Sequence, residues 1–173
     1  LHKLRSAGHI DILINNAATV EPLGATAQIP PEAVRAAFEI NVVVPFAMTG
    51  ALVPGMVDAG WGRIVNISSS VAGNPASMIG GNVYAATKAA IEAHSRNLAA
   101  ELADTGVTVN AYRPGGVDTA MQGWIRDQDP ERIGSVLRDR FTSRYEAGDL
   151  ISAHESAARL LDHLLGADAD TTG

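Results

Sequence analysis

A tyrosine and a lysine four residues apart, Tyr84 and Lys88 in the segment YAATK, are well suited to acid–base chemistry. Residues at this spacing share one face of a helix, so the ammonium group can lie beside the phenol. A phenol has a pKa of about 10 and is a weak base at neutral pH, but a neighbouring positive charge lowers that pKa. The pair therefore predicts proton transfer to or from a substrate oxygen. An exposed helix pair without a function has the same spacing and is the competing interpretation.

Three consecutive serines, Ser68, Ser69 and Ser70, supply hydroxyl groups directly after the apolar run Arg63–Ile67. We expect this run to be a buried strand, and open α/β sheets bind their ligands at the carboxyl ends of such strands. Counting from the strand favours Ser69 as the substrate-binding serine, whereas counting back from Val71-Ala-Gly73 favours Ser70. We expect Ser69 and retain Ser70 as the alternative. Ordinary turn formation also accounts for such a run of serines.

Asn41 is a candidate because of the proline that follows it. Pro45 has no N–H and cannot donate to the carbonyl of Asn41, four residues earlier in an apolar segment that we expect to be helical. A buried free carbonyl needs a partner, and water is a natural one. The sequence thus predicts a bound water beside Asn41, with a simple helix kink as the alternative.

The elements that would position these residues alternate between strands and helices. Three short runs rich in Ile and Val indicate strands at Ile10–Ile14, Arg63–Ile67 and Val107–Tyr112. Helices are expected at Pro31–Met56 and Val83–Ala103, from Pro130 after the capping residue Asp129, and at Ser152–Leu165. This alternation predicts an α/β fold: a Rossmann-like, doubly wound parallel sheet that is incomplete, with three recognisable strands and helices on both faces. We expect a single domain over residues 1–173.

Composition excludes several classes of function. The chain has a net charge of −6 with scattered Lys and Arg, whereas nucleic-acid binding needs clustered basic residues. It contains no cysteine, and its five histidines lack metal-ligand spacing, so we expect no metal site. With neither a signal peptide nor an apolar run of membrane-spanning length, we expect a cytoplasmic protein without a membrane partner. The arginines of segment 126–144 are expected on a solvated helix face and not in an anion site.

Several motifs occur together in one order. The segments RIVNISSSVAG, YAATK and VTVNAYRPGGVDTAM follow one another across the chain. With them, the chain resembles the short-chain dehydrogenase/reductase family. Residues 12–18 (ILINNAA) resemble that family's NNAG strand end, residues 38–41 (FEIN) the helix with its active-site asparagine, and residues 113–119 (RPGGVDT) its PG…T loop.

The resemblance implies an NAD(P)-dependent oxidoreductase that interconverts a secondary alcohol and a ketone by hydride transfer. Tyr84 would be the general acid/base, Lys88 would lower its pKa, Ser69 would hold the substrate oxygen and Asn41 would hold a relay water. The residues that would contact NAD or NADP are Asn15, Ala17, Tyr84, Lys88, Pro114, Gly115, Val117 and Thr119. An apolar substrate wall is expected from Met78, Ile79, Met121, Trp124 and Ile125. The resemblance also implies a homo-oligomer.

Two departures from the family pattern bear on function. The sequence contains no GxxxGxG or GxGxxG string, which in such folds cradles the pyrophosphate of a dinucleotide. We therefore expect the catalytic half of a dehydrogenase, truncated at its N-terminus and also without the C-terminal strand. Ala18 stands where the family has glycine, and we expect it to be tolerated. The alternative is a non-catalytic fragment or interaction module that retains the motif by descent, with Ile10–Ile14 as an exposed sheet edge.

Overall fold

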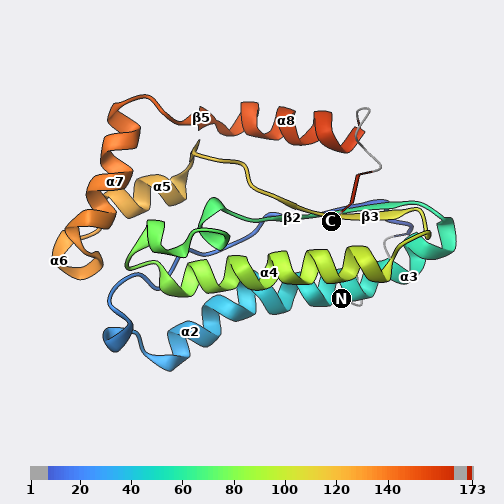
Figure 1. Ribbon diagram of the computed structural model, residues 1–173, viewed down its shortest axis with the longest axis horizontal. Coiled ribbons are helices and arrows are strands. Elements are labelled where there is room, and N and C mark those ends of the chain that lie inside the picture. The colour runs from blue at the N-terminus through green and yellow to red at the C-terminus, as the bar shows by residue number, and fades with distance from the viewer. Residues whose placement is uncertain (1–7, 166–170, 173) are drawn as a thin grey trace.

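A three-stranded parallel sheet forms the centre of the computed structural model, which describes residues 8–165 and 171–172. The strands lie in the order β1 (Ile12–Asn15), β2 (Gly62–Ile67) and β3 (Val107–Tyr112). Both pairings are parallel, so the three carboxyl ends lie along one edge (Figure 1). The three predicted strands are confirmed, with shifts of one or two residues at the first two.

One face of the sheet is covered by two long helical segments (Figure 1). The first comprises α2 (Pro31–Phe38), a π-helical turn (Glu39–Val43) and α3 (Val44–Ala59). The predicted single helix is therefore interrupted. Within the turn, the N–H of Val44 donates to the carbonyl of Glu39, five residues earlier, directly before the proline that has no N–H to donate. The second segment is α4 (Asn82–Glu101), close to its predicted bounds.

Taken together, Pro31–Ala59 is 29 residues long and contains an 18-residue window with a mean hydropathy of 1.7, so it is long and apolar enough by length and composition to cross a membrane. No apolar run of membrane-spanning length was expected from the sequence, and this segment corrects that expectation. Leu52 and Met56 of the same segment are buried in the core cluster beneath the sheet, however. The helix thus packs on the sheet along one side, and its apolar character partly reflects that packing.

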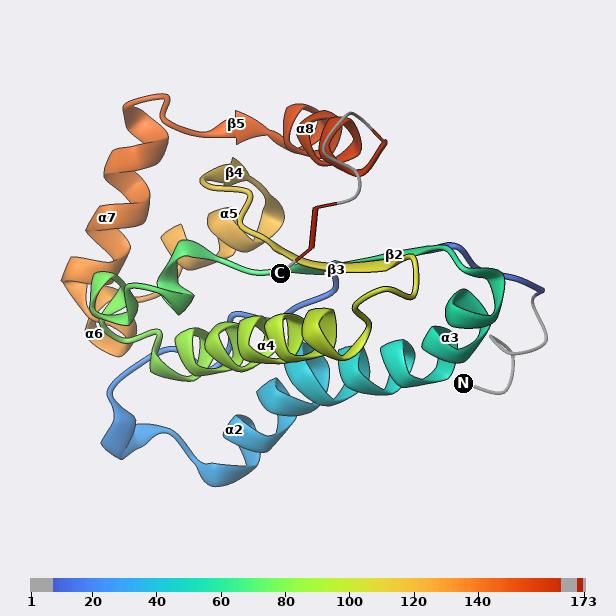
Figure 2. The same ribbon diagram turned by 45° about the vertical axis from the view of Figure 1, so that its right-hand side comes forward.

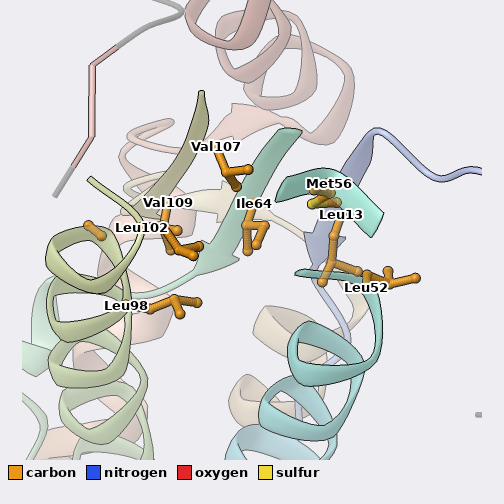
Figure 3. Packing of buried hydrophobic residues seen from close by; sticks show 9 residues of the cluster. Leu13, Leu52, Met56, Ile64, Leu98, Leu102, Val107 and Val109 are labelled. Carbon is orange, nitrogen blue, oxygen red and sulfur yellow. The ribbon is translucent and has the colours of Figure 1, made fainter. Parts of the chain in front are cut away.

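The principal core lies between the sheet and α3 and α4 (Figure 3). Ile64 of the central strand is fully buried and lies between Leu13 and Val109 of its neighbours, while Leu98 and Met56 approach from the two helices. Burying each of these side chains contributes about 1.5–3 kcal/mol. This packing fixes the position of α4, the helix that carries Tyr84 and Lys88.

The other face of the sheet is covered by α8 (Ala153–Leu165), which confirms that helices flank both faces (Figure 1). Leu160 and Leu164 of this helix pack against Val65 of β2. The predicted start of the helix is confirmed, because the Ser152 hydroxyl accepts a hydrogen bond of 3.1 Å from the backbone N–H of Glu155.

A group of short elements stands across the carboxyl ends of the strands (Figure 2). It consists of α5 (Ala120–Arg126), α6 (Pro130–Ile133), α7 (Ser135–Glu146) and a parallel pair of two-residue strands, β4 (Val117–Asp118) and β5 (Ile151–Ser152). Short 3-10 turns occur at Thr26–Gln28, Ser70–Ala72 and Pro75–Met78. The predicted cap at Pro130 is confirmed by a 2.8 Å bond from Glu131 N–H to the Asp129 carboxylate.

Gly106 precedes β3 and is required by its surroundings. Its φ of +82° is a left-handed conformation, and a Cβ atom there would lie 2.0 Å from the carbonyl oxygen of Gly60. It is not the cap of α4, because that helix ends at Glu101 with Leu102 as its C-cap. Glycine is needed instead where the entry to β3 passes closely over the end of α3.

Candidate active site

A cavity of about 690 Å³ lies at the carboxyl ends of the strands, bounded by α4, α5, α7 and α8. Its size is typical of small-molecule sites. Among the predicted catalytic residues, Ser69, Tyr84 and Lys88 line it together, and Ser70 also reaches it. Residues far apart in the sequence are thus assembled by the parallel topology and by the docking of α4 on the sheet.

The Tyr84 phenol is largely buried in this cavity. Burial raises the pKa of Tyr84, and hydrogen bonding with the Ser69 side chain lowers it to a smaller extent. The net direction is opposite to the lowered pKa that the sequence predicted from Lys88. Tyr84 is accordingly a protonated hydroxyl at neutral pH, able to donate to an oxygen atom in the cavity.

Lys88 lies one turn after Tyr84, with its ammonium nitrogen 5.5 Å from the centre of the tyrosine ring. The ammonium donates a 2.7 Å hydrogen bond to the carbonyl of Ile67, the last residue of β2. Burial lowers the pKa of Lys88 to about 8. The ammonium is therefore held at the strand end, and burial of the phenol is the main cause of the raised pKa of Tyr84.

Asn41 is buried in the π-helical turn, and its side chain fixes the loop after β1. Its amide oxygen accepts a 2.8 Å bond from the N–H of Thr19, and its amide nitrogen donates to the Thr19 carbonyl at 2.8 Å. The same nitrogen donates to the hydroxyl of Thr87 on α4 at 3.0 Å. Asn41 thus joins three segments around the cavity. The predicted water beside its carbonyl stays a prediction.

A buried carboxylate, which sequence reasoning missed, links the other two strand ends. Glu92 accepts a 2.7 Å bond from the Ser68 hydroxyl after β2, and two bonds of 2.6 Å from the Arg113 guanidinium after β3. The hydrogen bonds from Arg113 are the main cause that lowers the pKa of Glu92. Glu92 stands four residues after Lys88 on the same helix face, which was the available signal.

The residues predicted to contact a dinucleotide are mostly found at the cavity. Six others besides Tyr84 and Lys88 were named, and five of them line it: Ala17, Pro114, Gly115, Val117 and Thr119. The side chain of the sixth, Asn15, instead donates a 2.8 Å bond to Asn66 within the sheet. Asn16, the next residue, lines the cavity. Ala18 needs no positive φ, because Asp104 is the one non-glycine residue with positive φ in the described part of the chain.

The predicted apolar wall is partly assembled. Met78, Met121 and Ile125 line the cavity. Ile79 instead is 71% exposed. Trp124 does not line the cavity and packs behind it, against the buried cluster that contains Met78 and Ile125. The cavity therefore has an apolar side formed by the turn before α4 and by α5.

The prediction for the arginines of segment 126–144 is partly wrong, although Arg132 is exposed as expected. A solvated helix face was expected, but Arg140 and Arg144 line the cavity. Arg126 is also largely covered, with a side chain only 17% exposed, and lies over the ring of Tyr145. Charged residues at helical spacing are typical of an exposed face, and only the docking of α7 at the strand ends places these side chains inward.

Comparison with known proteins agrees with this arrangement. The family model described as short chain dehydrogenase matches residues 2–130. The chain belongs to the short-chain dehydrogenase family. A relative named as a putative ketoacyl reductase of Streptomyces coelicolor is 34% identical over 168 residues, which are 94% of this chain and 62% of the relative. The acetoacetyl-CoA reductase of Cupriavidus necator is 35% identical over 130 residues, 75% of this chain and 52% of that protein.

Solved structures of short-chain dehydrogenases share the fold. An actinorhodin polyketide ketoreductase with NADPH superposes with a TM-score of 0.82 and 31% identity, over 98% of this chain and 66% of that one. A xylitol dehydrogenase with bound NAD⁺ has a TM-score of 0.82 at 24% identity, over 99% of this chain and 68% of that one. The chain spans 62% of the ketoacyl reductase and 52% of the acetoacetyl-CoA reductase that it resembles.

Proposed function

We propose that this short-chain dehydrogenase is an NAD(P)-dependent oxidoreductase that interconverts a ketone and a secondary alcohol. The observation that carries the proposal is the convergence of Tyr84, Ser69 and Lys88 in one cavity at the strand ends. Ligands of parallel α/β sheets bind at this edge. The ketoacyl and acetoacetyl-CoA reductases among the relatives support a carbonyl group as the reacting function.

In this proposal Tyr84 moves the proton and Ser69 holds the reacting oxygen. Because burial keeps Tyr84 protonated, the phenol is ready to donate to a ketone oxygen as an alkoxide forms. The Ser69 hydroxyl interacts with Tyr84, so one oxygen atom can contact both groups, which favours Ser69 over Ser70. Lys88, with a pKa of about 8, exchanges protons near neutral pH and can restore the proton of Tyr84.

The residues around the cavity also fit a dinucleotide. Asn16 and Ala17 follow β1, and Gly115, Val117 and Thr119 follow β3, so small and polar groups line the site on both sides of the catalytic residues. A bound NAD or NADP would supply the hydride acceptor or donor. In the proposed arrangement, Lys88 and Thr119 would contact its nicotinamide half and Ala17 its adenosine half.

We further propose that the protein is a homo-oligomer that pairs through α3 and the π-helical turn before it. Ile40, Val43, Val44 and Phe46 are each 44–48% exposed on this segment. Phe46 stacks on His94 of α4, with ring centres 3.6 Å apart, so the patch continues onto the second helix. Contiguous exposed apolar side chains of this kind are typical of interfaces.

Titration of the purified protein with NADH and NADPH, followed by nucleotide fluorescence, tests the proposal. Saturable binding of at least one nucleotide is expected, with the affinity reduced by Thr119→Ala. Arg159→Gln, on the exposed side of α8, is the matched control and should leave the affinity unchanged. Absence of binding by either nucleotide would favour the alternative of a non-catalytic interaction module.

A further inference from the structure

Two arginines on α7, Arg140 and Arg144, face the same cavity as Tyr84. They stand four residues apart, so their side chains leave the same face of the helix. The helix lies across the carboxyl end of the sheet, beside α5 (Figures 1 and 2). Two positive charges therefore border the space in which the proposed reaction takes place.

Neither guanidinium has a hydrogen-bond or carboxylate partner within the described ranges, 8–165 and 171–172. The Nη1 atom of Arg140 is buried and without an acceptor there. Burial, and then the positive charge of Arg144, lower the pKa of Arg140. Arg113 and Arg159, by contrast, each bind a glutamate. A covered cation without an acceptor is costly unless a ligand supplies one.

The loop after β3 accommodates Arg144 closely. A Cβ atom at Gly116 would lie 2.5 Å from one terminal nitrogen of the Arg144 guanidinium. The guanidinium therefore lies close to the loop that also carries Gly115 and Val117, both of which line the cavity. Arg144 is thus positioned at the cavity wall both by α7 and by the loop after β3.

We propose that Arg140 and Arg144 bind an anionic group of the substrate, a carboxylate or a phosphate, so that the substrate is an acidic ketone or alcohol. The inference rests on the proposed function and names its substrate class. Met78, Met121 and Ile125 give the cavity an apolar side, which suits a hydrocarbon stem between the anion and the reacting carbon. The chain carries a net charge of −6, so these two cations reverse the prevailing charge locally.

Paired probes that differ in charge test this proposal. Acetoacetate and levulinate would be compared with their methyl esters by calorimetry, on the wild-type protein and on Arg140→Gln, Arg144→Gln and the double variant. Because a hydrogen bond to a charged group contributes about 1.5–3 kcal/mol, the double variant should bind the acids at least about 10-fold more weakly. Binding of the esters should stay within about 2-fold. Arg132→Gln removes the same charge from an exposed arginine on α6 and should change nothing.

The same variants, titrated with NADH and NADPH, separate the two possible sources of the anion. Unchanged nucleotide affinity is expected. Reduced nucleotide affinity with unchanged acid binding would assign the arginines to the cofactor's diphosphate and overturn the proposal. Equal weakening of acids and esters would also overturn it, because it would indicate a packing role. If the wild-type protein bound the acids through these arginines but bound neither nucleotide, the oxidoreductase proposal would fail while the anion site stood.

Discussion

Burying Lys88 in the candidate active site lowers the stability of the fold. Its ammonium is buried beside Tyr84, and burial lowers its pKa to about 8. One hydrogen bond to the Ile67 carbonyl offsets part of that cost. The motif YAATK predicted the pairing of Tyr84 and Lys88, but not the direction of the Tyr84 pKa, because burial and the orientation of the ammonium depend on the docked helix.

The pH dependence of stability should report the burial of Lys88. The folded-state pKa lies below the unfolded value of 10.5, so between about pH 8 and 10.5 the unfolded chain binds more protons and stability rises with pH. Relative to Lys88→Met, the wild-type protein should gain roughly 2 to 3 kcal/mol in the free energy of unfolding between pH 7 and pH 10. Urea denaturation of both proteins measures this. A difference that is independent of pH would show that Lys88 is not buried as a cation.

At the scale of elements, local pattern predicted the strands better than the helices around the site. Runs such as VTVNAY need only burial on both faces to form a strand, and Val107–Tyr112 was predicted to the residue. The π-helical turn at Asn41 was missed, although Pro45 indicated that a helical bond was lost there. The arginine-bearing segment 126–144 was predicted to be a solvated helix face, because its position over the strand ends is set by tertiary packing and not by local sequence.

The ion pair between Glu92 and Arg113 should stabilise the strand ends far more than an exposed pair of equal length. The Glu92 side chain is 7% exposed and also satisfies Ser68, whereas the pair of Glu155 and Arg159 has the same 2.6 Å separation in solvent. Glu92→Gln should lower the free energy of unfolding by about 1–3 kcal/mol, and Glu155→Gln by no more than about 0.5 kcal/mol. Chemical denaturation of both variants at neutral pH provides the comparison.

The stability that Glu92 contributes should depend on pH. The pKa of Glu92 is lowered in the folded state, so its contribution is present above the unfolded carboxyl pKa and is lost as the pH falls through the folded value. The stability difference between wild type and Glu92→Gln should therefore shrink in acid. Equal losses for Glu92→Gln and Glu155→Gln at neutral pH would contradict a structural role for the buried carboxylate.

For the whole molecule, the π-helical turn and the start of α3 leave a group of apolar side chains exposed. The sequence predicted the apolar helix and, by resemblance, an oligomer, but could not separate the side that packs on the sheet from the side that faces outward. Leu52 and Met56 point to the core, whereas Val43 and Phe46 are nearly half exposed. A second copy of the chain would bury this patch without disturbing the cavity at the strand ends.

If the protein oligomerises through this patch, a charge introduced there should weaken association, and a charge introduced elsewhere on the surface should not. Val43→Asp should shift the protein towards the monomer in sedimentation equilibrium, because a charge within an apolar interface is unfavourable. Val136→Asp, on a valine 70% exposed on α7, is the matched control and should leave the mass unchanged. A wild-type protein that is monomeric throughout the micromolar range would contradict the proposed interface.

The central claim, proton transfer by Tyr84, is tested most directly by the rate of ketone-dependent oxidation of NADH or NADPH by the purified protein and by Tyr84→Phe. General acid–base catalysis contributes about 10²–10⁴-fold, so Tyr84→Phe should lose that factor in kcat while its nucleotide affinity stays within about 2-fold. Tyr145→Phe, which alters an exposed tyrosine on α7, should retain the wild-type rate. Turnover by Tyr84→Phe equal to that of the wild-type protein would contradict the account, as would a wild-type protein that binds nucleotide and reduces none of the ketones supplied.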